Sequence, residues 1–288
     1  MPYWSLGWRA ATVLAAVLVA GSVGVRRPRA RRLAPAAPVL RELGIVFLLF
    51  ALWLLAGSHA HTHVAGAQDR AMDIWRAERW LHLPSEVTVQ HAVLPLHWLV
   101  RRINDYYAGA HLSGMLIFLC WLLWRHRGAY ARARNIVVLL TASALLIQMV
   151  PVAPPRMFPH LGFVDTGLLY HQSVYGPVGS GVPTQLAAMP SLHVGWSVLV
   201  AVVVVAVSTS RWRWLVVLHP LATMYVVVVT ANHWWFDGLA AIGLLALVWP
   251  LELALETAWR HLPPFAVPQP LAGQAAEGIQ RVSAGSSR

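Results

Sequence analysis

The chain has 288 residues, of which 58% are hydrophobic and only 11% are charged, whereas soluble domains carry about 25% charged residues. This composition excludes an ordinary soluble globular protein and predicts that lipid forms part of the surrounding solvent. The formal net charge is +11, and a basic balance can indicate nucleic-acid binding. Here every basic residue is Arg, and the Arg residues gather at the ends of apolar runs. That placement favours topology signals and lipid-headgroup contacts, so no nucleic-acid partner is expected.

A helix needs roughly 20 apolar residues to cross a bilayer, and seven segments of the chain approach this length. They cover residues 6–25, 40–57, 107–124, 136–152, 192–208, 214–230 and 236–255. The first has a long apolar run without a strongly basic region before it, so we interpret it as a retained span rather than a signal peptide. The sequence therefore predicts an all-α, polytopic membrane helix bundle of about six to seven transmembrane helices, multi-pass in the cell membrane.

Arg residues set the expected orientation of these spans. They are concentrated in three connections, residues 26–41, 125–134 and 211–213. A seven-span arrangement places all three on one side, which the positive-inside rule makes cytoplasmic. The long connections 58–106 and 153–191 then lie outside, where Arg101 and Arg102 are the main conflict with the rule.

The expected domains are an N-terminal transmembrane pair over 1–57, a membrane domain that carries the chemistry over 58–257, and a cytoplasmic tail over 258–288. The tail is rich in Ala, Gly, Ser and Gln, which predicts disorder. Residues 73–83 are amphipathic and are expected to lie along the membrane interface. The outer connection 153–191 contains Pro and Gly throughout, and long structured loops tend to be functional.

The first candidate motif is AMPSLHVGW, residues 188–196, where the second outer connection enters the fifth span. Pro190 and Ser191 are typical of a helix start, with Ser191 near the N-cap. The free backbone N–H groups and the dipole of such a helix end attract an anion such as phosphate. His193 would lie beside that anion in the first turn. The alternative is a histidine that anchors a helix end at the membrane interface.

The second candidate motif is NHWWFD, residues 232–237. If residues 233–237 are helical, their spacing puts His233 and Asp237 on one face. A carboxylate there can fix the tautomer of the imidazole and make its other nitrogen a better nucleophile or base. An ionisable residue within an apolar segment is costly and is a functional candidate. The alternative is a pair that satisfies itself at the interface.

The third candidate is Arg156 at the end of PVAPPR, residues 151–156. Its guanidinium suits phosphate, and the alternative is an Arg that extends to lipid headgroups. Asp165 and Thr166 follow in the same loop without an assigned role. His111 lies near Tyr106 and Tyr107 at the outer start of the third span, where an aromatic belt is expected, and it can face the site.

The alternating histidines His59, His61 and His63 are the only pattern that suggests a metal site. Asp69 is the one acid near them and no Cys is adjacent, so a solvated loop is the favoured interpretation, and we expect neither a metal nor a cofactor. The single Cys120 excludes an internal disulfide.

Together, the APPR-like, AMPSLH and NH…D motifs, in this order, resemble the type 2 phosphatidic acid phosphatase superfamily over about residues 80–255. The closer resemblance is to its branch of inositol phosphorylceramide synthases and related bacterial membrane proteins. It implies a metal-independent lipid phosphatase or phosphotransferase that acts on a membrane lipid through a phosphohistidine. In this interpretation His233 attacks phosphorus, Asp237 orients His233, and His193 protonates the leaving alkoxide. The substrate-binding residues would be Arg156, Pro190, Ser191, Leu192 and His111.

Two positions depart from the superfamily pattern. Its first motif has a Lys where this chain has Met149, and its third has an Arg where this chain has Val227. Phosphate binding must then use fewer cations, which favours the synthase-like branch. Hydrolysis and headgroup transfer share the covalent intermediate, and the sequence identifies neither the lipid nor the oligomeric state. The alternative function is a non-catalytic transporter or structural membrane protein.

Overall fold

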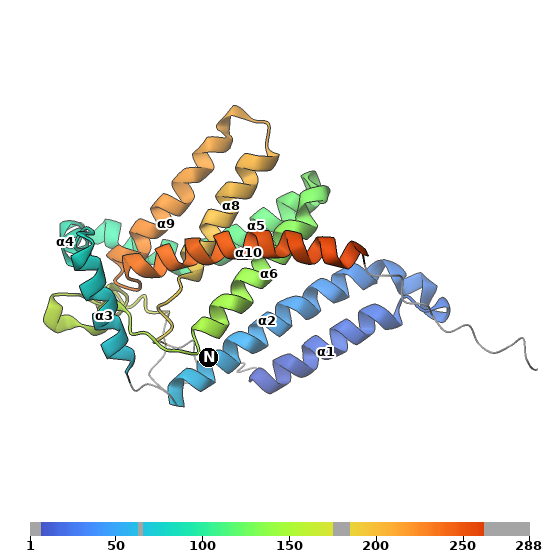
Figure 1. Cartoon of the computed structure of the whole chain (residues 1–288), viewed down its shortest axis with the longest axis horizontal. Helices are drawn as coiled ribbons and strands as arrows, with labels where there is room; N and C mark the ends of the chain where they lie inside the picture. The colour runs from blue at the N-terminus through green and yellow to red at the C-terminus, as the bar shows by residue number, and fades with distance from the viewer. Residues whose placement is uncertain (1–6, 63–65, 175–184, 262–288) are drawn as a thin grey trace, which may run out of the picture. The chain divides into compact units, whose positions relative to one another are not determined.

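The computed structural model describes residues 7–62, 66–174 and 185–261 (Figure 1). Within this part the chain forms helices and turns, with a single isolated bridge between Val152 and Ala187 in place of any strand. The predicted all-α class is therefore confirmed. The same part contains five helical segments long and apolar enough to cross a membrane, and two shorter apolar helices.

The apolar helices correspond to the seven predicted spans. They are α1 (Trp8–Gly24), α2 (Ala37–Thr62), α5 (His97–Arg125), α6 (Arg127–Ile147), α8 (Leu192–Val207), α9 (Leu218–Val229) and α10 (Trp235–His261). Helices α5 and α6 begin about nine or ten residues before their predicted spans, because their first turns are polar but still helical. The predicted boundary at residue 57 falls within α2. Residues 258–261 of the predicted tail are helical, and residues 262–288 lie outside the described part.

Two short helices, α3 (Ala67–Trp80) and α4 (Glu86–Val93), lie between α2 and α5. Ser85 caps α4 by accepting the N–H of Thr88. We call these two helices and their connection, Ala67–Val93, the α3–α4 cap. The predicted amphipathic stretch, residues 73–83, is therefore helical only as far as Trp80. The remaining elements are η1 (Pro28–Ala36), η2 (Pro155–Met157), η3 (Pro159–Leu161), α7 (Thr166–Leu169) and η4 (Arg211–Val217).

Helix α8 lies at the centre of the main apolar cluster, in which residues of α5, α6, α8 and α10 pack together. The flexible end of the Met224 side chain in α9 packs over Gly238 in the first turn of α10, with Cε 2.3 Å from where a Cβ atom would lie. The N–H of Ser191 donates to the carbonyl of Asp237 at 2.9 Å. This bond holds the first turns of α8 and α10 together at one end of the bundle.

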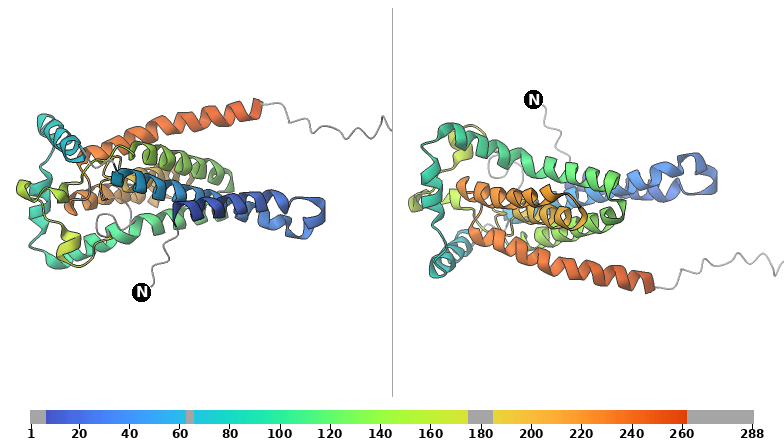
Figure 2. Two further views of the ribbon diagram at one scale, coloured as in Figure 1. Left: turned by 90° about the horizontal axis from the view of Figure 1, so that it is seen from below. Right: turned by 90° about the horizontal axis from the view of Figure 1, so that it is seen from above.

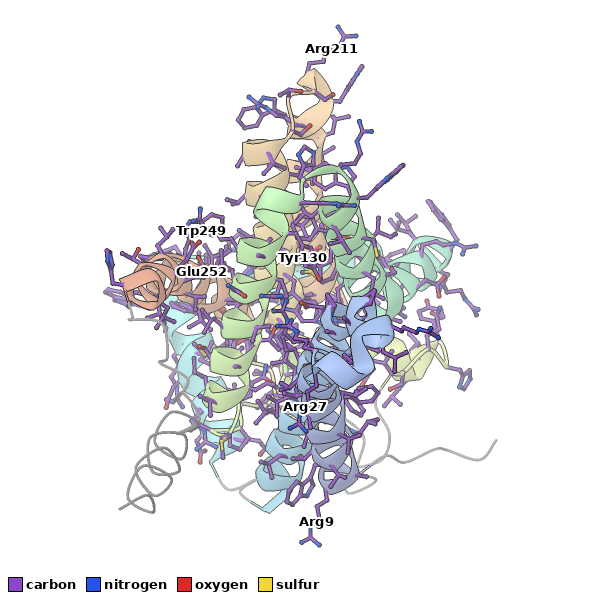
Figure 3. The ribbon with its side chains drawn as sticks, turned by 90° about the vertical axis from the view of Figure 1, so that its right-hand side faces the viewer. Arg9, Arg27, Tyr130, Arg211, Trp249 and Glu252 are labelled. Atoms are coloured by element: carbon purple, nitrogen blue, oxygen red, sulfur yellow. The ribbon has the colours of Figure 1, made fainter. Side chains whose placement is uncertain are left out.

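Two ion pairs between apolar helices lie away from that end. Glu42 of α2 pairs with Arg134 of α6, and Glu252 of α10 is 3.4 Å from Arg132 of α6. Figure 3 labels Glu252 beside α6, together with Arg27 and Arg211 on the connections α1–α2 and α8–α9. These four ionisable groups therefore pair between helices α2 and α6 and between α6 and α10.

The α3–α4 cap and the loop after α6 lie together at one end of the bundle (Figure 2). Helices α5, α8 and α10 begin at this end, whereas α6 and α9 finish there. The Arg-rich connections α1–α2, α5–α6 and α8–α9 come after the C-terminal ends of α1, α5 and α8, away from this end. The chain direction therefore separates the candidate motifs from the Arg-rich connections.

Candidate active site

His233 lies in the short turn between α9 and α10. Helix α9 ends at Val229, and Ala231 adopts a left-handed conformation with φ of 53°. The carbonyl of Val227 accepts the N–H groups of Asn232 and His233, at 3.1 and 3.2 Å. His233 is therefore outside the helix, and the prediction that residues 233–237 form one helical face is wrong. The turn nevertheless brings His233 to Asp237, because Asp237 lies in the first turn of α10.

A backbone carbonyl fixes the tautomer of His233. Its Nδ1 is 2.7 Å from the carbonyl oxygen of Ala188 and 3.3 Å from Oδ2 of Asp237. A carbonyl oxygen can only accept, so Nδ1 of the neutral ring carries the proton. Nε2 then holds the lone pair and is the nucleophilic atom. Because His233 is buried, the orientation of its ring is set by these contacts and by packing.

Asp237 has two roles in the geometry. Its Oδ2 accepts the N–H of Trp234 at 2.8 Å, which caps the start of α10, and the same oxygen faces His233. The side chain is fully buried. Its backbone carbonyl accepts the N–H of Ser191 at 2.9 Å. This contact joins the two motifs that the sequence placed far apart.

The first turn of α8 is open. Ser191 is its N-cap residue, as predicted, but the hydroxyl makes no capping bond and has no partner among the described residues. The N–H groups of Leu192, His193 and Val194 have no acceptor within the helix, because the first turn lacks preceding carbonyls. Pro190 is held by a bond from Nε2 of Gln148 to its carbonyl oxygen, 3.0 Å long. The arrangement suits an anion at the start of α8.

His193 packs among aromatic rings of α5. Tyr107 stacks on it with centroids 4.5 Å apart and an interplanar angle of 15°, and its backbone is hydrogen-bonded to the ring. The centroid of His111 is 4.0 Å away and that of His233 is 5.8 Å away. The structure therefore brings both predicted catalytic histidines and His111 together. Tyr107 is only 6% exposed, so its assignment to an aromatic belt is wrong.

Arg156 is buried beside the turn that holds His233. Its Nη1 donates to Oδ1 of Asn232 at 2.7 Å, and its Nε lies 3.6 Å from Oδ2 of Asp165. The backbone N–H of Arg156 also donates to the carbonyl of Ala231 at 2.9 Å. The alternative of an Arg extending to lipid headgroups is therefore wrong. Asp165 acquires a role as the counter-charge of Arg156.

Backbone contacts hold the three motifs as one unit. Val152 pairs with the start of the AMPSLH motif and the residues before it, through bonds to Ala188 and Leu186. Nε1 of Trp234 donates to the carbonyl of Ala153 at 3.0 Å. A small pocket opens next to this unit, lined by Asn104, Tyr107, Asp165, Gly167, Gln172, Ser173, Val174 and Asn232. Residues far apart in the chain thus surround one polar site.

The structure describes no group of three or more metal-binding side chains. Of the alternating histidines, His63 lies outside the described residues, and the side chains of His59 and His61 are not described. The expected absence of a metal site therefore stays a prediction.

Three contributors to the site were not predicted from the sequence: Tyr107, the carbonyl of Ala188 and Glu78. Tyr107 lies four residues before His111 on α5, and this spacing could have shown that Tyr107 faces His193 together with His111. The carbonyl of Ala188 has no side-chain signal. Glu78 appeared to belong to an interfacial helix, but it is buried and bonds to the N–H of Phe236.

The three motifs coincide with one family match. The sequence model of the PAP2 superfamily matches residues 72–251, which is more than half of the chain. Comparisons with curated proteins and with solved structures gave no match. The matched range includes the α3–α4 cap from residue 72 on, together with Arg156, His193, His233 and Asp237.

Proposed function

Because this chain belongs to the PAP2 superfamily, we propose that it is an integral membrane enzyme that cleaves or transfers a phosphate ester of a lipid through a phosphohistidine on His233. Membership of the superfamily supports a phosphatase or phosphotransferase type of activity in general. The observation that carries the finer proposal is the bond between Nδ1 of His233 and the carbonyl of Ala188. In the neutral ring, this bond places the proton on Nδ1 and the nucleophilic lone pair on Nε2, beside an open helix N-terminus.

In the proposed reaction, Nε2 of His233 attacks phosphorus and the bond to the leaving alkoxide breaks. His193 supplies the proton that the alkoxide takes up. The centroids of the two rings are 5.8 Å apart, a separation at which one phosphoryl group can be within reach of both. Water or an alcohol then attacks the phosphorus of the phosphohistidine and gives its proton to His193, while the N–P bond breaks and restores the lone pair of His233. Two displacements replace one difficult step.

Phosphate oxygens would bind at the start of α8, where the hydroxyl of Ser191 and the first-turn N–H groups are located. Arg156 would contribute positive charge through its position beside Asn232 rather than as an exposed cation. Val227, at the place of the superfamily Arg, is fully buried in an apolar cluster. This low number of cations supports a place in the branch of inositol phosphorylceramide synthases and related bacterial proteins.

We propose that the site faces the extracytoplasmic side. The site residues lie at the ends of the helices that are opposite to the Arg-rich connections, and these connections are expected in the cytoplasm. In a Cys120→Ala background, Val174→Cys should react with an impermeant thiol reagent in intact cells, whereas Ala30→Cys and Trp212→Cys should react only after permeabilisation. The reverse labelling pattern would place the site in the cytoplasm.

The function is tested with purified protein and a panel of phospholipids. The panel contains lipid phosphomonoesters, and lipid phosphodiesters supplied with a lipid alcohol as acceptor. Released phosphate and exchanged headgroups are both followed, which separates hydrolysis from transfer. Turnover should survive an excess of EDTA, because the proposed chemistry needs no metal. Loss of turnover in EDTA that a divalent cation restores would contradict the mechanism, and a wild-type protein inactive on every lipid would contradict the function.

A further inference from the structure

The α3–α4 cap contacts the start of α10 and the end of α9. Oε1 of Glu78 accepts the N–H of Phe236 at 2.8 Å, and Nε1 of Trp235 donates to the carbonyl of Pro84 at 2.8 Å. On the other side of the turn, Nε2 of Gln90 donates to the carbonyl of Val229 at 2.9 Å. The turn that carries His233 is therefore bonded to the cap on both sides.

Glu78 faces a second buried carboxyl group, Glu86 of α4. The two residues are 0% and 1% exposed, and their side chains are hydrogen-bonded to each other. Oε2 of Glu78 and Oε1 of Glu86 are both buried, and no described donor group bonds to either of them. Two carboxylates cannot bond to each other without a proton, so one of them carries it.

The charges around the pair decide which carboxyl is neutral. Arg79 lies 3.0 Å from Oε2 of Glu86, so Glu86 has the counter-ion. Within the described part of the chain no cation pairs with Glu78, and Asp237 adds a further negative charge nearby. Burial, then the hydrogen bond and the charge of Glu86, raise the pKa of Glu78 from 4.5 to about 9. Glu78 is therefore the protonated member.

We propose that Glu78, in its protonated form and bonded to Glu86, is a positioning residue for His233. It holds the N–H of Phe236, the residue before Asp237, and so fixes the first turn of α10 on which the orientation of His233 depends. This inference rests on the proposed function only where turnover is the readout. Its structural consequence, an ordered start of α10, can be measured without substrate.

The pH dependence follows from linkage. The folded protein keeps the Glu78 proton up to about pH 9, whereas the unfolded chain loses it near 4.5. The stabilisation is thus fully present below 4.5 and is lost as pH rises through 9. Above that pH, a charged Glu78 faces both Glu86 and Asp237, and the start of α10 should loosen.

Two substitutions distinguish the effect of the Glu78 proton from the effect of its hydrogen bonds to Phe236 and Glu86. In Glu78→Gln, the amide oxygen can still accept the Phe236 N–H, and the amide NH₂ can donate to Glu86 at any pH. Glu78→Ala removes both bonds. The matched control is Asp73→Asn, which neutralises an exposed carboxylate on the same helix.

The first measurement is amide hydrogen exchange of residues 234–238 in the detergent-solubilised full chain, corrected for intrinsic rates. Glu78→Ala should raise exchange there by roughly tenfold or more, because a bond to a buried carboxyl is lost, while Glu78→Gln and Asp73→Asn match the wild type at pH 7. Between pH 8 and 10 the wild type should lose protection and Glu78→Gln should keep it. Should Glu78→Ala not fold, this pH comparison decides alone.

The second measurement is kcat and KM against pH. We expect an alkaline fall in kcat of the wild type that Glu78→Gln lacks, with KM unchanged. Wild-type protection that persists to pH 10, or an equal alkaline loss in Glu78→Gln, would overturn the positioning role. An inactive wild type with the expected exchange pattern would overturn the proposed function and leave the positioning of α10 supported.

Discussion

The first turns of α8 and α10 lie side by side at the site. They differ in whether carboxyl side chains accept hydrogen bonds from their first backbone N–H groups. At α10, the N–H of Trp234 donates to Asp237 and that of Phe236 donates to Glu78. At α8, Ser191 makes no side-chain cap, and no carboxylate bonds to the first turn within the described residues. An anion is therefore favoured at α8 and disfavoured at α10.

The difference explains why the two histidines suit different tasks. His233 belongs to the carboxylate-capped turn and is held rigidly by the carbonyl of Ala188, as a nucleophile requires. His193 belongs to the open turn, where phosphate and its leaving group would be located. In the proposed reaction, one helix end would hold the attacking group and the other would bind the charge that develops.

The largest expected effect comes from the nucleophile at the capped turn. His233→Ala should lower turnover by more than roughly 10⁴-fold and abolish the covalent phosphoenzyme. Acid-quenched trapping of labelled phosphate on the purified variant measures this. A labelled His233→Ala protein would show that another residue is the nucleophile.

The next effect comes from the acid at the open turn. His193→Ala should lower the rate by about 10²–10⁴-fold for a lipid alkoxide leaving group. The loss should be much smaller for an aryl phosphate, whose leaving group is already a stable anion. Single-turnover rates with both substrates test the assignment. Equal losses, accompanied by a lower thermal midpoint, would instead indicate a structural role.

A smaller effect is expected from the carboxylate of the capped turn. Asp237→Asn keeps an oxygen that can accept from Trp234 and removes only the charge. The carbonyl of Ala188 still fixes the tautomer of His233, so we expect a loss in kcat of about 10–100-fold, the range of a charged hydrogen bond. Asp237→Ala should also lower stability by about 1 kcal/mol through loss of the cap. Identical kcat in Asp237→Asn and wild type would leave Asp237 as a cap alone.

The smallest effect concerns the uncapped hydroxyl of α8. Ser191→Ala should lower kcat/KM by roughly tenfold without reducing the thermal midpoint, because that hydroxyl has no partner among the described residues. Ser197→Ala is the matched control on the same helix, since its hydroxyl bonds to the carbonyl of Val194 at 2.8 Å. Equal activity of both variants would remove Ser191 from the phosphate site.

The amino-acid sequence by itself determined the class of the protein and the residues to inspect. Apolar runs and Arg placement are local properties, so the all-α membrane class could be read directly. Ser191 at the start of α8, and the motifs around His193 and His233, were also found because helix starts and ionisable groups in apolar segments stand out locally.

Only the tertiary structure decided how these residues act. The tautomer of His233 depends on a carbonyl 45 positions earlier in the chain, at Ala188, and backbone carbonyls have no sequence signature. Glu78 reads as a surface acid in an amphipathic helix, yet packing buries it against α10. Arg156 reads as an unpaired cation, yet the loop folds Asp165 onto it. In each case the outcome rests on a long-range contact, which the local pattern of residues does not encode.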